Sequence, residues 1–222
     1  MNHKPVVIFG TGTFAEMAAV YLNRDSPRDV LAFTVDGQYA NAHRFHGLPL
    51  IAFDEFLESH PPDRVDLLVA IGYSQVNGIR QSVYERCGDL GYGFVTYVSS
   101  KACVMSDEDI GENTFIFEAS VIQQAVTIGN DVIVWAGSHI GHHSRIEDHC
   151  FIAPCAAISG NVVVRERSFV GLNATLRDGI TVGRKCVIGA GAVVLRDQED
   201  GTVLGSTTTA AHPRKSWELR NI

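Results

Sequence analysis

Residues 110–194 carry an aliphatic side chain at every sixth position, and no other feature of the chain restricts the possible folds so strongly. The series runs through Ile110, Ile116, Ile122, Ile128, Val134, Ile140, Ile146, Ile152, Ile158, Val164, Val170, Leu176, Val182, Ile188 and Val194. A period of six matches neither the 3.6-residue period of a helix nor the two-residue alternation of a half-exposed strand. It is typical of a triangular solenoid, in which three short strands make one eighteen-residue coil and successive coils stack about 4.8 Å apart.

The residue before each aliphatic points outward in such a solenoid, and every third repeat shares one face of the prism. One face then carries an unbroken apolar stripe, formed by Tyr97, Phe115, Ile133, Phe151, Phe169 and Val187. The outward residues of the other two faces are smaller or polar. Because an exposed apolar stripe usually marks an interface, we expect this face to pack against another copy of the chain, most simply in a closed cyclic trimer.

Residues 1–97 have a different texture, in which short apolar runs alternate with helical segments. The runs "PVVIFG", "VLAFTVD" and "DLLVAIG" are typical of buried strands, and "TFAEMAAVYLNR" and "VNGIRQSVYERCGDLG" have helical spacing. This alternation predicts a small parallel sheet of the α/β class. We therefore divide the chain into an α/β domain at 1–97 and a solenoid with a C-terminal tail at 98–222.

The segment "GTGTFA", with Gly10, Gly12 and Ala15, follows the first strand and opens a helix. This pattern matches a loose dinucleotide fingerprint, in which backbone N–H groups at the helix start hold a phosphate. Asp36 ends the second strand, where its carboxylate can accept a hydrogen bond from a ribose hydroxyl or a base. Because a complete NAD site usually needs two such halves, we favour the diphosphate of a nucleotide sugar, with a purely structural turn as the alternative.

Composition and charge exclude several classes of function. A formal net charge of −7 argues against nucleic-acid binding, and no apolar run approaches the roughly 18 residues of a membrane span. The N-terminus enters a strand without a signal-like apolar stretch, and the five cysteines form no C-x-x-C pair. We expect a cytoplasmic protein with reduced thiols.

Four of the nine histidines lie within residues 137–154, and their place on the solenoid determines what they can do. A zinc site needs three or four side chains that converge on one point, whereas His139, His142, His143 and His149 fall on different repeats and corners. We therefore expect no metal. Because His142 lies at a turn, its imidazole is either a solvated corner group or able to face a neighbouring subunit, and we interpret the other three as surface residues.

The hexapeptide repeats and the segments "IFGTGTFAE", "VDG", "VAIG", "IGHHSRIEDHCFIAP", "FVGLNATL" and "VIGAGAVV" resemble one family along almost all of the chain. They are similar to the bacterial nucleotide-sugar acyltransferases with a left-handed parallel β-helix. These include the sialic acid O-acetyltransferase type and the UDP-4-amino-sugar N-acetyltransferases of bacillosamine synthesis. The resemblance implies a homotrimer that uses acetyl-CoA, with active sites between subunits and the nucleotide on the N-terminal domain.

The resemblance also implies roles for individual residues. His142 aligns with the catalytic base of the family, and the following His143, as a possible modulator, replaces a frequent carboxylate that Glu118, Glu147 or Asp148 would have to supply. Nine residues after His142, Phe151 replaces a histidine near the acetyl carbonyl. The nucleotide would be lined by Gly10, Thr11, Gly12, Thr13, Asp36, Ile71 and Gly72. The cofactor would lie along Phe151, Gly160, Leu172, Asn173, Gly189 and Ala190, with Arg184, Lys185 and Arg214 as candidates for its phosphates.

These observations together predict an acetyl-CoA-dependent N-acetyltransferase that acts on the amino group of a nucleotide-linked amino-deoxysugar. No serine or cysteine lies in a nucleophile motif, so we expect direct attack on the thioester. Two alternatives remain. One is O-acetylation of a sugar hydroxyl, with the same fold and base. The other is a non-catalytic solenoid that binds a nucleotide sugar, which the two departures from the family pattern make conceivable.

Overall fold

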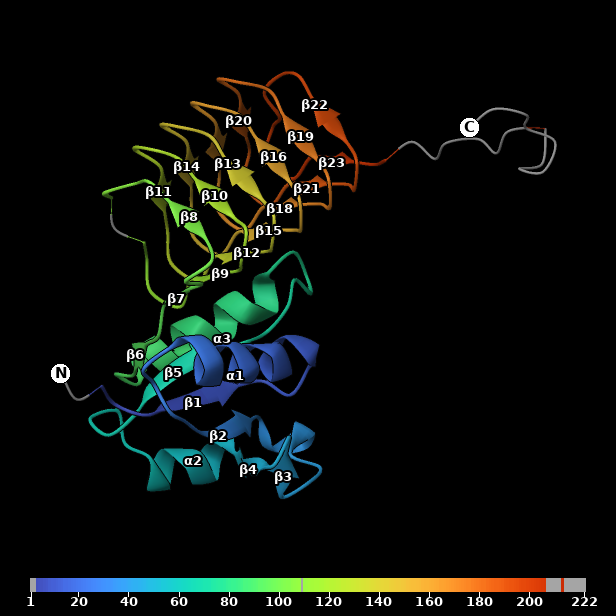
Figure 1. The fold of residues 1–222 in the computed structure, drawn as a ribbon. Coiled ribbons are helices and arrows are strands. Elements are labelled where there is room, and N and C mark those ends of the chain that lie inside the picture. Colours follow the sequence, from blue (N-terminus) through green and yellow to red (C-terminus); the bar gives the residue numbers. More distant parts are fainter. Residues whose placement is uncertain (1–2, 109, 207–212, 214–222) are drawn as a thin grey trace.

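A computed structural model describes residues 3–108, 110–206 and 213, and it contains an α/β domain and a parallel β-helix (Figure 1). The elements of the α/β domain are β1 (Val6–Phe9), α1 (Thr13–Asp25), β2 (Val30–Val35), the 3-10 helix η1 (Gly37–Tyr39), β3 (Arg44–Phe45), β4 (Leu48–Ala52), α2 (Phe53–Ser59), β5 (Asp66–Val69), α3 (Gly78–Asp89) and β6 (Gly93–Phe94). The sheet order is β3-β4-β2-β1-β5-β6. All pairs are parallel except β3 with β4, as the alternation of strands and helices predicts.

The β-helix consists of two-residue strands that form three sheets along the sides of a prism. Face 1 contains β7 (Tyr97–Val98), β9 (Phe115–Ile116), β12 (Ile133–Val134), β15 (Phe151–Ile152), β18 (Phe169–Val170), β21 (Val187–Ile188) and β23 (Val203–Leu204). Face 2 contains β8 (Cys103–Val104), β10 (Val121–Ile122), β13 (His139–Ile140), β16 (Ala157–Ile158), β19 (Thr175–Leu176) and β22 (Val193–Val194). Face 3 contains β11 (Thr127–Ile128), β14 (Arg145–Ile146), β17 (Val163–Val164) and β20 (Thr181–Val182).

The register of these strands confirms the eighteen-residue coil. On face 1, Phe115 pairs with Ile133, which pairs with Phe151 and then with Phe169, always in parallel. The aliphatic residues of the repeat point inward and form one continuous buried cluster along the prism. Since strands two residues long cannot stand alone, this stack of side chains holds each coil on its neighbours.

The turns between faces repeat as regularly as the strands. One residue in each turn has a left-handed backbone conformation, for example His143 with φ 58°, Cys155 with φ 57° and Asn161 with φ 55°. We call the edges of the prism corner 1–2, corner 2–3 and corner 3–1, after the faces that meet there. His142 and His143 lie at corner 2–3, and Glu147 to Cys150 form a turn of corner 3–1.

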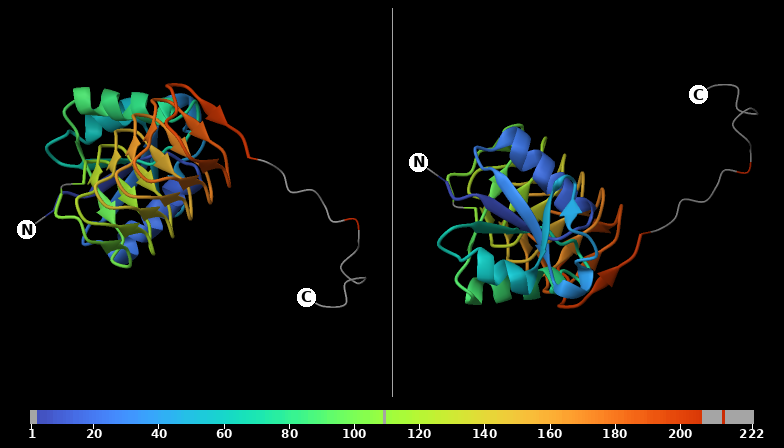
Figure 2. Two further views of the ribbon diagram at one scale, coloured as in Figure 1. Left: turned by 90° about the horizontal axis from the view of Figure 1, so that it is seen from above. Right: turned by 90° about the horizontal axis from the view of Figure 1, so that it is seen from below.

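The apolar stripe on face 1 is covered within the same chain. The expectation that this face packs against another copy of the chain is therefore wrong. Helix α1 of the same chain covers it, with Phe14 packed edge-on against Phe115 at 5.5 Å between ring centroids. At most 5% of the surface of Tyr97, Phe115 and Phe151 is exposed to solvent. Figure 2 shows the α/β domain overlapping the side of the prism both from above and from below. A stripe in the sequence reveals that a face is covered, but it does not identify what covers it.

A buried polar cluster joins the same two domains beside this apolar contact. Arg80 of α3 and Asp131 of corner 3–1 are both without exposed side-chain surface, and Nε of Arg80 lies 3.0 Å from Oδ1 of Asp131. Arg80 also donates to the carbonyl oxygens of His149, Cys150 and Gly72. Its guanidinium therefore binds both the β-helix and the loop that follows β5.

The cluster also corrects the expectation that His149 is a surface residue. His149 is only 6% exposed, and its Nδ1 lies 2.8 Å from Oδ2 of Asp131. The third polar partner of Asp131 is Asn113, whose Nδ2 donates to Oδ1 at 2.7 Å. His149 is thus part of the domain contact.

Candidate functional site

The predicted nucleotide-binding residues converge at the carboxyl ends of three parallel strands. Gly10 to Thr13 follow β1, Asp36 follows β2, and Ile71 and Gly72 follow β5. Gly10 has φ 139°, and a Cβ there would lie 2.7 Å from the carbonyl oxygen of Ala70, so only glycine fits. Gly12 is the N-cap of α1, and no atom would contact a Cβ built on it. The start of α1 is therefore open, in the arrangement that suits a phosphate.

Asp36 has a basic partner that the sequence did not reveal. Nη2 of Arg86 lies 2.7 Å from Oδ1 of Asp36, and the Arg86 guanidinium stands over the rings of Phe9 and Phe53. Arg86 comes from α3 and is fifty residues from Asp36 in the sequence. Any ligand that hydrogen-bonds to Asp36 therefore meets a carboxylate that is already paired with an arginine.

His142 lies at corner 2–3, where its ring is exposed. Its backbone N–H donates to Oε1 of Gln123 at 2.9 Å, which holds the turn on the coil before it. The ring reaches over Gly160 on the next coil, since a Cβ built on Gly160 would lie 2.6 Å from Cε1 and 2.7 Å from Nε2 of His142. A cavity of about 420 Å³ opens here, lined by Met105, Gln123, Gln124, His142 and His143.

His143 contacts the ring of His142 directly, with 3.1 Å between the two Nδ1 atoms. Two imidazole nitrogens at this distance must share one proton, so one ring donates and the other accepts. If Nδ1–H of His142 is the donor, Nε2 of His142 has a free lone pair beside Gly160. His143 can in this way select the tautomer that a general base requires.

The three carboxylates proposed to replace the missing acid all lie elsewhere. Glu118 accepts a hydrogen bond from the Tyr21 hydroxyl at 2.8 Å, Asp148 accepts one from the backbone of Asn130, and Glu147 is held at corner 3–1 by Arg145. None of them is near His142 in this chain. The carboxylate that does lie close is Asp178, whose Oδ1 would be 3.0 Å from a Cβ on Gly160. Asp178 is two coils beyond His142 by the eighteen-residue period. It is not a neighbour of His142 in the sequence, so its proximity follows only from the period.

The predicted cofactor residues divide between three places on the prism. Leu172, Asn173, Gly189 and Ala190 lie at corner 1–2, whereas Gly160 lies beneath His142 at corner 2–3. Phe151 lies on face 1, where Tyr73 covers it and its ring stacks on Phe169. Its side chain thus meets the α/β domain, and a contact with the cofactor stays a prediction. Arg214 lies outside the described residues.

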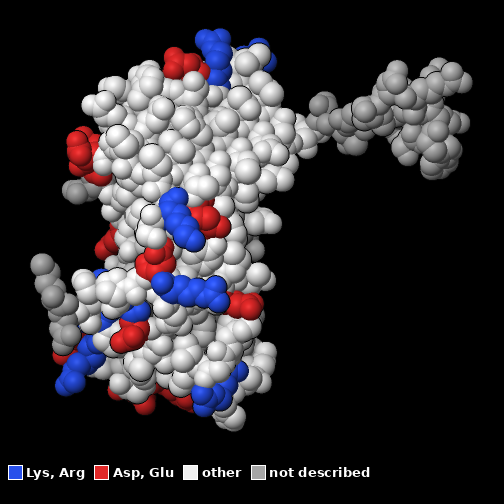
Figure 3. Space-filling model, in the orientation of Figure 1, with Lys and Arg blue, Asp and Glu red and all other residues white. Residues whose placement is uncertain are grey.

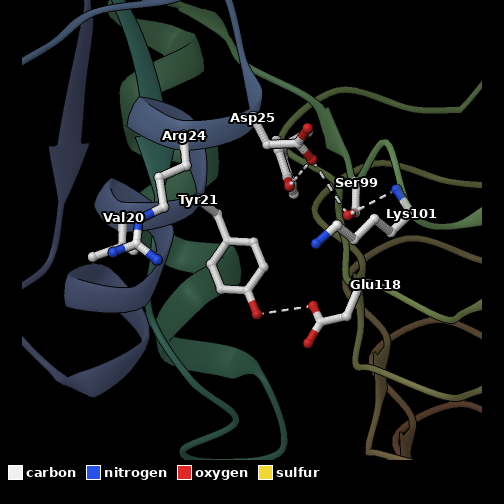
Figure 4. A pocket seen from close by; sticks show the side chains of 8 residues that line it. Val20, Tyr21, Arg24, Asp25, Ser99, Lys101 and Glu118 are labelled. Carbon is white, nitrogen blue, oxygen red and sulfur yellow. Dashed lines mark hydrogen bonds between the residues drawn. The ribbon is translucent and has the colours of Figure 1, made fainter.

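A separate cavity of about 340 Å³ lies between α1 and the first coils of the β-helix (Figure 4). Tyr21 and Glu118 join across it, and Arg24 and Lys101 lie at its edge. Asp25 accepts hydrogen bonds there from the hydroxyl of Tyr97 and the backbone of Ser100. Of the candidate residues from the sequence, Glu118 lines this cavity, and the polar groups of the cavity connect the two domains.

Within the part of the chain that the structure describes, no group of three or more His, Cys, Asp or Glu side chains is arranged to hold a metal ion. Among the same residues, no helix is both long enough and apolar enough to cross a membrane. Corner 2–3 itself presents two imidazoles, a carboxylate and backbone groups.

Two family models match the β-helix. Residues 109–142 and 125–160 match the bacterial transferase hexapeptide (six repeats), and residues 158–196 match the hexapeptide repeat of succinyl-transferase. Over 188 residues the chain is 26% identical to GDP-perosamine N-acetyltransferase of Escherichia coli O157:H7, and the match covers 83% of this chain and 82% of that protein.

Two solved structures extend the likeness over both domains. One is a histidine-to-asparagine variant of perosamine N-acetyltransferase from Caulobacter crescentus in complex with CoA and GDP-perosamine. It is 28% identical, with a TM-score of 0.82, over 91% of this chain and 93% of that one. The other is the acetyltransferase domain of PglB from Neisseria gonorrhoeae FA1090 in complex with acetyl coenzyme A, 25% identical, with a TM-score of 0.81, over 92% and 97%. Together with the repeat and the register of the coils, these matches show a left-handed β-helix with an N-terminal α/β domain, and they make the chain similar to the hexapeptide-repeat acyltransferases.

Proposed function

We propose that the chain is an acetyl-CoA-dependent N-acetyltransferase that acts on the amino group of a nucleotide-linked amino-deoxysugar. The relatives support this substrate class, because the two perosamine enzymes match the chain over both of its domains. The open helix start at Gly12 and the strand ends around Gly10, Asp36 and Gly72 would hold the nucleotide. We further propose that the protein acts in the cytoplasm.

His142 is the proposed general base. Its Nε2 takes a proton from the attacking amine, the new C–N bond forms at the thioester carbon, and the C–S bond breaks. The proton on Nε2 then passes to the leaving thiolate, so that His142 returns to its starting state. Since Phe151 lies on face 1 and carries no hydrogen-bond donor, backbone N–H groups would have to stabilise the oxyanion.

One observation carries the proposal that the active site lies between subunits. The α/β domain covers face 1, whereas His142 lies at corner 2–3, the edge of the prism opposite that face. A nucleotide sugar bound to the α/β domain therefore cannot present its amine to His142 of the same chain without passing around the β-helix. A second copy must bring its own corner 2–3 to the nucleotide, and a cyclic homotrimer does this for all three chains.

Face 2 is the surface that we propose for this contact, in place of face 1. Its outward residues are Val121, His139, Ala157, Thr175 and Val193, and Figure 3 shows a broad stretch of the β-helix without Lys, Arg, Asp or Glu. Face 2 also joins corner 1–2 to corner 2–3. A groove between two copies would thus bring Leu172 and Ala190 of one chain toward His142 of the next, with acetyl-CoA between them.

Thiol release from acetyl-CoA, measured with a panel of UDP-, dTDP- and GDP-linked amino sugars, tests the reaction. We expect turnover with at least one amino sugar and amide formation on its nitrogen. An O-acetyl product would instead favour the sugar O-acetyltransferase. Tight nucleotide-sugar binding without turnover of any panel member would favour a non-catalytic binding protein.

Mixed oligomers test the shared site. A His142→Ala chain and a Gly10→Ala chain, each impaired alone and each confirmed to fold, are co-expressed with different tags and purified as the mixed species. If the nucleotide and the base come from different chains, the mixture regains part of the native activity, because some interfaces combine two intact halves. Mixed species that remain inactive would contradict the shared site.

A further inference from the structure

Corner 2–3 carries a vertical column in which a histidine, a glycine and an aspartate follow one another at eighteen-residue intervals. These are His142, Gly160 and Asp178. In a solenoid, residues one coil apart normally stack side chain on side chain. Gly160 has no side chain, so the ring of His142 and the carboxylate of Asp178 both border the space above its Cα. A Cβ built on Gly160 would lie 2.7 Å from Nε2 of His142 and 3.0 Å from Oδ1 of Asp178, so these two atoms are less than 6 Å apart.

We propose that Asp178 binds the amino group of the acceptor and makes the enzyme selective for amines over hydroxyls. This inference rests on the proposed function and identifies the residue that recognises the amino group of the acceptor. Alkylamines are largely protonated at neutral pH, as the lysine side chain is, and a carboxylate gives the ammonium a charge-assisted hydrogen bond. A nitrogen bound between these two atoms, on the solvent side of Gly160, can contact both Asp178 and His142 at hydrogen-bond distance.

The donor count at this place favours nitrogen independently of charge. In the tautomer that leaves Nε2 free, His142 offers only an acceptor, and an ionised Asp178 also offers only acceptors. An ammonium or an amine has two or more N–H donors and can satisfy both groups at once. A hydroxyl has a single donor, so it would leave either the base or the carboxylate without a partner.

The same arrangement accounts for every proton of an ammonium acceptor. One N–H proton passes to Nε2 of His142 and later to the CoA thiolate. A second leaves through Asp178 to solvent, and the third stays on the amide nitrogen of the product. The C–N bond forms as the C–S bond breaks, so the amide, CoA and one released proton are the products.

The experiment compares two ligands on three proteins. The ligands are GDP-perosamine, or the amino sugar that proves active in the panel, and the same nucleotide sugar with a hydroxyl in place of the amino group. Their dissociation constants are measured by calorimetry on the native trimer, on Asp178→Asn and on Glu199→Gln. Glu199 is an exposed carboxylate elsewhere on the β-helix, so its variant loses the same charge at a distance from His142.

We expect Asp178→Asn to weaken binding of the amino sugar about tenfold, the scale of a hydrogen bond to a charged group near solvent. The hydroxyl ligand should bind as it does to the native protein, and Glu199→Gln should preserve the native preference for the amine. If Asp178→Asn folds normally and keeps the full preference, the subsite is wrong while the proposed function stands. If the native protein turns over no amino sugar at all, the proposed function fails and the subsite with it.

Discussion

The buried pair of Arg80 and Asp131 makes a quantitative prediction about stability. Arg80→Met preserves the length and the apolar stem of the side chain but removes the guanidinium. The Asp131 carboxylate, with no exposed surface, would then remain in the domain contact with only Asn113 and His149 as partners. Breaking a buried ion pair by removing one partner costs about 3–5 kcal/mol, because the other charge stays buried and uncompensated.

For a chain of this length, 1 kcal/mol corresponds to roughly 2–4 °C in the unfolding midpoint. We therefore expect Arg80→Met to lower the midpoint by about 6–20 °C, measured by circular dichroism at one fixed protomer concentration. The double variant Arg80→Met/Asp131→Asn should lose less than the sum of the single losses, because the buried negative charge is also removed.

The matched control is Arg64→Met, since the Arg64 side chain is 79% exposed and its contact with Asp63 is long, at 3.9 Å. An exposed ion pair contributes at most about 1 kcal/mol, so this midpoint should change by no more than a few degrees. A loss in Arg80→Met that is no larger than the loss in Arg64→Met would refute the reasoning.

Three further predictions concern the base, the nucleotide loop and a domain contact. His142→Ala should lower kcat by about 10²–10⁴-fold without changing the unfolding midpoint, and unchanged turnover would remove His142 as the base. Gly10→Ala should destabilise the fold by at least about 1 kcal/mol and weaken nucleotide binding, because Gly10 has a backbone conformation that alanine rarely adopts. Gly12→Ala is the control, since its methyl group would point into open space. Equal denaturant midpoints for the two variants would contradict this prediction. Hydrogen bonds, first from Ser100 and then from Tyr97, lower the pKa of Asp25 from 3.8 to about 2. The native protein should thus exceed Asp25→Asn in stability above pH 3.8, and this advantage should disappear as the pH falls toward about 2; thermal unfolding at several pH values would disprove the assignment if the advantage stayed constant.

The β-helix could be predicted almost completely from the sequence, because its repeat appears in every coil and leaves only one register. What lies on its outer surface was harder to predict. The stripe through Phe115 and Phe151 indicates a covered face, but apolar burial has no preference between α1 of the same chain and a second molecule. His149 carries no sequence signal of burial either, since its backbone carbonyl oxygen is held by Arg80, which comes from a different domain.

The candidate site shows the same limit. Gly10, Gly12 and Gly72 could be placed at one sheet edge, because parallel strands bring their carboxyl ends together. Sequence proximity favours Glu147 as the carboxylate near His142, whereas the period of the coil brings Asp178 close to it. In a solenoid, residues one or two coils apart in the sequence are neighbours in space, and adjacent residues of the sequence do not reveal them.

The guanidinium of Arg80 donates hydrogen bonds both to the loop after β5 and to a turn of the β-helix. These hydrogen bonds tie the two domains together, and in the proposed trimer they would fix the distance from the proposed nucleotide site to the proposed base. The proposed enzyme would then acylate only an amine at a fixed distance from the diphosphate of its substrate. It would not acylate substrates in which one additional sugar residue changes that distance.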